Sequence, residues 1–169
     1  MSTPVMKLTR RVAAVGGGVV MALCMVSPAG ATSAPTLHIT AGPYRDGESI
    51  RLSVGPNHLF KPYAHVNILE CADPKGKRSN LPVNDNTCDG NTIQGNTVLI
   101  AKNGSFSEHG YVLYGLPNSA SLGESPGGQP VCNQKRECVL YIGENQSSFT
   151  WPKMFSKPFT IATSTSKKK

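Results

Sequence analysis

Residues 64–71 read AHVNILEC, and this stretch decides the fold. Val66 and Ile68 fall on one side of an extended chain and alternate with polar side chains, which is typical of a β-strand. The stretch ends at Cys71, and a second cysteine follows at Cys88. A strand that ends in a cysteine with a partner nearby indicates a small fold of short strands held by a local disulfide.

Six further runs are rich in Val, Ile, Leu, Thr and Tyr, and clusters of Gly, Pro, Asn and Asp separate them. They are residues 36–41, 49–54, 96–101, 106–114, 138–142 and 159–162. Helical periodicity is nearly absent from this part of the chain. Seven short strands predict an all-β fold, either a two-sheet antiparallel sandwich or, as the alternative, a small closed barrel.

The start of the chain has the order of a secretory signal. Lys7, Arg10 and Arg11 precede an apolar run at 12–26, and a small-x-small triplet ends at Ala31. The run has 15 residues, fewer than the roughly 20 that a membrane-spanning helix needs. We therefore predict a signal peptide over 1–31, a secreted protein, a domain over 32–163 and a basic tail over 164–169.

Four cysteines remain after this cleavage, and four cysteines allow three connectivities. Loop-closure entropy favours the near pairs, Cys71 with Cys88 and Cys132 with Cys138. Neither spacing matches the tight knuckles of a zinc site. We predict two disulfides and no metal site.

The positive charge of the chain is concentrated at its ends. Of 17 basic residues three lie in the signal, which leaves 14 against 10 acidic residues, a charge of +4. Lys167, Lys168 and Lys169 supply three of those four charges. A body near neutrality argues against direct binding of nucleic acid. The lysine tail is either a solvated end or a contact to an anionic cell wall.

No arrangement of residues predicts catalysis. The four histidines and the carboxylates are scattered, and neither a nucleophile elbow nor a phosphate-binding loop occurs. Two aromatic groups, at 149–159 and around Phe60 and Tyr63, either cap the core or form exposed recognition surfaces. We therefore predict a protein that is not an enzyme.

The order of these features resembles the neocarzinostatin family of secreted actinobacterial proteins. The features are the signal, a strand pair, Cys71-Ala72, a cysteine partner, a turn at 103–105 (Asn-Gly-Ser), a second close cysteine pair and a C-terminal strand. The resemblance covers roughly residues 35–162. It implies a seven-stranded immunoglobulin-like antiparallel β-sandwich with two local disulfides.

The resemblance also implies a function of the antibiotic apoprotein type, in which the protein carries a non-covalent enediyne or other aromatic chromophore. DNA would then be damaged only through the chromophore, and we expect a monomer. The implied ligand-binding residues are Ile93, Leu113, Val139, Tyr141 and Gly143.

This chain departs from the family pattern in two ways. Residues 115–131 hold no aromatic side chain, and bulky residues follow Cys138, so that Tyr141 would itself fill the cleft. The alternative is a cell-envelope interaction module without a small ligand, which presents the loops at 73–87 and 115–131.

Overall fold

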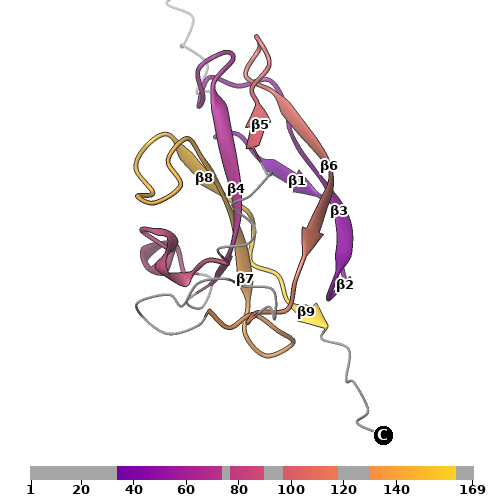
Figure 1. Ribbon diagram of the computed structural model, residues 1–169. Coiled ribbons are helices and arrows are strands. Elements are labelled where there is room, and N and C mark those ends of the chain that lie inside the picture. The colour runs from indigo at the N-terminus through magenta and orange to yellow at the C-terminus, as the bar shows by residue number, and fades with distance from the viewer. Residues whose placement is uncertain (1–33, 74–76, 90–96, 118–129, 163–169) are drawn as a thin grey trace, which may run out of the picture. The chain divides into compact units, whose positions relative to one another are not determined.

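The computed structural model describes residues 34–73, 77–89, 97–117 and 130–162, all within one compact unit, Ser33–Lys169 (Figure 1). The predicted signal peptide, Ile93 and the lysine tail lie outside these ranges. The described residues form an all-β fold. Nine strands and two short 3-10 turns, η1 (Arg78–Asn80) and η2 (Asp85–Thr87), are present, without an α-helix in this part of the chain.

The first sheet has three antiparallel strands in the order β1 (Leu37–Ile39), β3 (Glu48–Val54) and β6 (Phe106–Leu113). Its register shifts between Ile50 and Arg51, which pair with Tyr111 and His109, so Gly110 is an extra residue in β6. Gly110 has a φ of +99°, a conformation that glycine adopts without steric cost. The sheet therefore contains a β-bulge.

The second sheet has four antiparallel strands in the order β5 (Thr97–Leu99), β4 (His65–Ala72), β7 (Cys138–Gly143) and β8 (Lys153–Phe155). A short parallel pair, β2 (Tyr44–Arg45) with β9 (Ile161–Ala162), completes the strands. Figure 1 shows β3 and β6 along one side and β4, β7 and β8 along the other.

All seven predicted strands overlap strands of the structure, with boundaries that differ by a few residues. The sequence-based prediction missed β2 and β8. Both are only two or three residues long and follow closely on Pro43 and Pro152, so neither shows a readable alternation.

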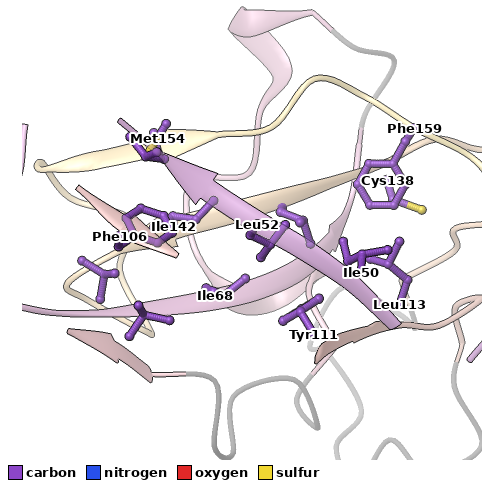
Figure 2. Packing of buried hydrophobic residues seen from close by; sticks show 14 of the residues in the cluster. Ile50, Leu52, Ile68, Phe106, Tyr111, Leu113, Cys138, Ile142, Met154 and Phe159 are labelled. Carbon is purple, nitrogen blue, oxygen red and sulfur yellow. The ribbon is translucent and has the colours of Figure 1, made fainter. Parts of the chain in front are cut away.

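One hydrophobic core lies between the two sheets. Side chains from β3, β4, β6 and β7 contribute to it, and Figure 2 shows Leu52, Ile68, Tyr111 and Ile142 among them. From Ser49 to the end of β3 the residues alternate between exposed and buried, because one face packs on this core and the other meets water.

The strands β4 and β7 do not alternate. All six residues of β7 are buried, as are six of the eight in β4. Their sheet is therefore covered on both faces, which explains the nearly continuous apolar run at 138–142.

The structure contains the two predicted disulfides. Cys71–Cys88 joins β4 to the segment that contains η2. Cys132–Cys138 joins β7 to the loop before it, and both of its cysteines belong to the core between the sheets.

Candidate binding site

A second apolar cluster covers the outer face of the four-stranded sheet. We call it the outer cluster; its buried members are Leu69, Cys71, Cys88, Val139, Tyr141 and Phe149. Leu81 and Phe155 pack against it and are half-buried. The strands supply alternate residues to the two cores, since Leu140 and Ile142 belong to the core between the sheets.

An aromatic stack forms the centre of the outer cluster. The rings of Tyr141 and Phe149 lie 3.6 Å apart between centroids, with an angle of 10° between their planes. The ring of Phe155 is tilted against both, at 5.6 Å from Tyr141 and 6.3 Å from Phe149. Stacked and edge-on pairs of this kind contribute about 0.5–1.5 kcal/mol each beyond the area they bury.

Gly143 allows Tyr141 to lie flat along the strand. The two residues are alternate positions on the same face of β7, and a Cβ built on Gly143 would collide with the phenol oxygen of Tyr141. The phenol donates a hydrogen bond to the carbonyl of Asn145 at 2.7 Å. Burial of the phenol raises the pKa of Tyr141 to about 12, although its hydrogen bond with Asn145 opposes this shift.

Phe149 belongs to the loop between β7 and β8, residues 144–152, which we call the covering loop. The side chain of Asn145 accepts hydrogen bonds from the backbone N–H groups of Ser147 and Ser148, at 3.0 and 2.9 Å. The N–H of Phe149 donates to the carbonyl of Val83 at 3.1 Å, and the ammonium group of Lys153 donates to the carbonyl of Phe149. These bonds hold Phe149 over Tyr141.

Asn67 holds the first residues of the covering loop. Its amide nitrogen donates to the carbonyl of Glu144 at 3.2 Å, and its amide oxygen accepts from Gln146 at 2.7 Å and from Thr97 at 3.3 Å. Asn67 is buried, so these bonds satisfy a polar group that water does not reach.

Three of the residues expected to bind a ligand lie together. Val139, Tyr141 and Gly143 share the outer face of β7, with the first two in the outer cluster. Leu113 lies instead in the core between the sheets. All four are buried in this structure, whereas Ile93 falls outside the described residues.

Phe149 and Phe155 were not predicted to belong to this site. The aromatic residues of 149–159 form one group in the sequence, but the structure divides them. Phe149 and Phe159 are buried, while Trp151 is 74% exposed. The same division separates buried Phe60 from Tyr63, which is 62% exposed.

Glu70 is a fully buried carboxyl group between the two sheets. The N–H of Tyr114 donates to its Oε2 at 3.0 Å, and its Oε1 lies 3.6 Å from Cys132 Sγ. Burial raises the pKa of Glu70 well above its usual value of 4.5, and the negative charges of Asp89 and Asp46 raise it further, against the opposing effect of the Tyr114 hydrogen bond. Burial therefore favours the neutral form of this carboxyl group.

The side chains of Glu70, Cys132 and Cys138 lie within 4.8 Å of one another. The two sulfurs form a disulfide, so they present no thiolate to a metal ion. Within the described ranges no other group of three potential ligands comes as close. The arrangement serves the fold rather than a metal.

No protein-family model matches the chain, and no curated protein or solved structure proved similar to it. A search of the described residues found no helix with the length and hydropathy to cross a membrane.

Proposed function

We propose that the protein is a secreted, non-enzymatic binding protein that takes a planar aromatic ligand on Tyr141. The parallel stack of Phe149 on Tyr141 carries this proposal, because it is a site that already holds a flat ring. The ligand stacks on Tyr141 after the covering loop moves Phe149 away. Phe155 and the Cys71–Cys88 disulfide then form the walls of the site.

The proposed fold is the seven-stranded immunoglobulin-like sandwich of the neocarzinostatin family, with β2 and β8 as short additions. Two sheets that share a core and two local disulfides support it. In that setting the ligand is a chromophore of the enediyne type or another aromatic molecule, and DNA is reached only through it. Secretion is supported by the disulfides, which form in oxidising compartments.

Binding must compete with an internal ring. The ligand replaces a stack that already stabilises the folded protein, so its affinity for the wild-type protein is reduced by the cost of moving Phe149. Removal of the Phe149 ring therefore strengthens binding, provided that Tyr141 stays in place.

The test is a fluorescence titration of the full chain with a naphthol. We expect Phe149→Ala to tighten binding about tenfold, since one aromatic stack no longer competes. Tyr141→Leu should abolish binding. Phe106→Ala is the matched control, because Phe106 is also a buried ring but lies in the core between the sheets. Phe149→Leu serves as a milder second variant. The proposal fails if neither the wild type nor either Phe149 variant binds.

A second candidate is an interaction module of the cell envelope. Trp151 and Val83 are both 74% exposed and lie on adjoining segments, since the N–H of Phe149 bonds to the carbonyl of Val83. Exposed apolar side chains on adjoining segments favour contact with another macromolecule. Cell fractionation tests this function: wall-bound protein that salt releases, and that Trp151→Ala no longer retains, supports it.

A further inference from the structure

The outer face of the three-stranded sheet is open, in contrast to the covered outer face of the other sheet. Its side chains alternate with those that β1, β3 and β6 direct toward the core. Seven of these side chains are polar, and all seven are exposed. They are His38, Thr40, Ser49, Arg51, Ser53, Ser107 and His109, which we call the open face.

Arg51 stands at the centre of the open face. His109 of β6 lies directly opposite it in the register. On its other side Thr40 exchanges two bonds with it, because the N–H of Arg51 donates to the Thr40 hydroxyl at 3.0 Å and the N–H of Thr40 donates to the Arg51 carbonyl at 3.1 Å. The next row across the sheet consists of His38, Ser53 and Ser107.

The open face contains no carboxylate. On β3 and β6 the two acidic residues are Glu48 and Glu108, and both take positions in register with core residues, Leu113 and Leu52. The carboxylate of Glu48 also accepts a hydrogen bond from the N–H of Arg45, at the turn before β3. Arg51 has no ion-pair partner among the residues that the structure describes.

We propose that the open face binds the phosphate groups of a flexible anionic polymer that carries no nucleobases. The guanidinium group of Arg51 offers a planar set of donors that matches a phosphate, and the surrounding hydroxyl and imidazole groups also donate. Neighbouring strands are about 4.8 Å apart, and alternate residues along one strand are about 7 Å apart. The side chains of the open face can therefore contact several phosphates of one polymer.

The same face is poorly suited to nucleic acid. Proteins that bind single-stranded DNA or RNA stack the bases on aromatic rings, and the open face has no Phe, Tyr or Trp. The exposed aromatic side chains of the described residues, Tyr63 and Trp151, lie outside β1, β3 and β6. A polymer recognised through its phosphates alone is the better match.

The test measures binding of the full chain to long-chain inorganic polyphosphate and to poly(glycerol phosphate), with single-stranded DNA as a comparison. We expect Arg51→Gln to weaken binding to both polymers about tenfold, the loss of one charge-assisted contact group. Arg78→Gln is the matched control, because Arg78 is also exposed but lies in η1.

Three results would overturn the proposal. A triple change of Lys167, Lys168 and Lys169 to Gln tests the tail, and loss of binding there with no effect of Arg51→Gln overturns the proposal. An equal effect of Arg78→Gln also overturns it, as does tighter binding of DNA than of either base-free polymer. Because Arg51 is exposed, unchanged far-ultraviolet dichroism will show that Arg51→Gln is folded.

Discussion

Tyr141 lies over Gly143 on the same face of β7, and the space that its phenol fills exists only because Gly143 has no side chain. The phenol reaches the carbonyl of Asn145 from this position, and its ring presents a flat surface to Phe149. A glycine in a strand usually weakens it, because it has no side chain to pack. Here it makes room for the aromatic stack that covers the sheet.

Gly143→Ala should displace Tyr141 and separate it from Phe149. Forcing an extra methyl group into a packed site costs about 1–3 kcal/mol of unfolding free energy. Urea denaturation measures the loss, and near-ultraviolet dichroism reports the changed ring environment. Gly55→Ala is the control, since a Cβ there meets nothing within 4 Å. Equal stability of the two variants would contradict the packing described for Tyr141.

The raised pKa of Glu70 predicts how the stability of the protein depends on pH. Its pKa is raised in the folded protein, so the folded state binds the proton more tightly than the unfolded chain. Its contribution to stability is therefore complete below about pH 4.5 and is lost as the pH rises through the higher folded pKa. Glu70→Gln should be more stable than the wild type at alkaline pH and should show a weaker dependence on pH.

Thermal unfolding of both proteins across this pH range provides the measurement for Glu70. Glu137→Gln supplies the control, because it removes a carboxyl group that is exposed rather than buried between the sheets. A Glu70→Gln variant that still loses stability between pH 4.5 and alkaline pH would assign the effect to another group.

Gly47 and Gly104 have similar φ angles but different surroundings, so substitutions at the two positions distinguish backbone strain from steric collision. Gly47 has a φ of +79° and Gly104 a φ of +82°, but a Cβ on Gly47 meets nothing within 4 Å, whereas one on Gly104 would collide with the backbone of Asn57. We expect Gly47→Ala to cost about 1 kcal/mol, the cost of a left-handed conformation. Gly104→Ala should cost at least twice as much in the same denaturation assay. Equal costs would argue against the close contact between Gly104 and the backbone of Asn57.

The two disulfides should differ in their effect on stability. Cys71–Cys88 closes a loop of 17 residues and Cys132–Cys138 one of 6. In the chain-entropy model, replacing each pair by serine costs about 3 and about 2 kcal/mol respectively. Denaturation of the two double-serine variants measures the difference. A larger loss for Cys132–Cys138 would show that its position in the core between the sheets outweighs the entropy of the loop.

The sequence predicts the strands best where one face of a sheet meets water. The stretch at 49–54 alternates because Ile50 and Leu52 face the core and Arg51 faces solvent. The run at 138–142 shows a strand but not which of its faces a ligand would meet, because β7 is buried on both sides. The position of each strand along the chain is a local property, and composition is enough to indicate it.

The site was harder to predict, because it depends on how distant segments meet. Tyr141 was correctly placed in a strand with Gly143 directly after it, but their cover comes from Phe149 in a loop whose path is set by hydrogen bonds to Asn67 and Val83. Local sequence patterns do not predict contacts between such distant segments. Likewise, the spacing of cysteines suggests the disulfides, whereas the burial of Glu70 beside one of them depends on the packing of two sheets.

The covering loop carries the chain's single tryptophan, Trp151, two residues after Phe149 and largely open to solvent. The protein thus has an intrinsic optical reporter at the element that must move when Tyr141 is uncovered, and no label needs to be attached. Shifts in indole emission will follow that loop, while the four tyrosines other than Tyr141 lie outside the aromatic stack and report on the remainder of the chain.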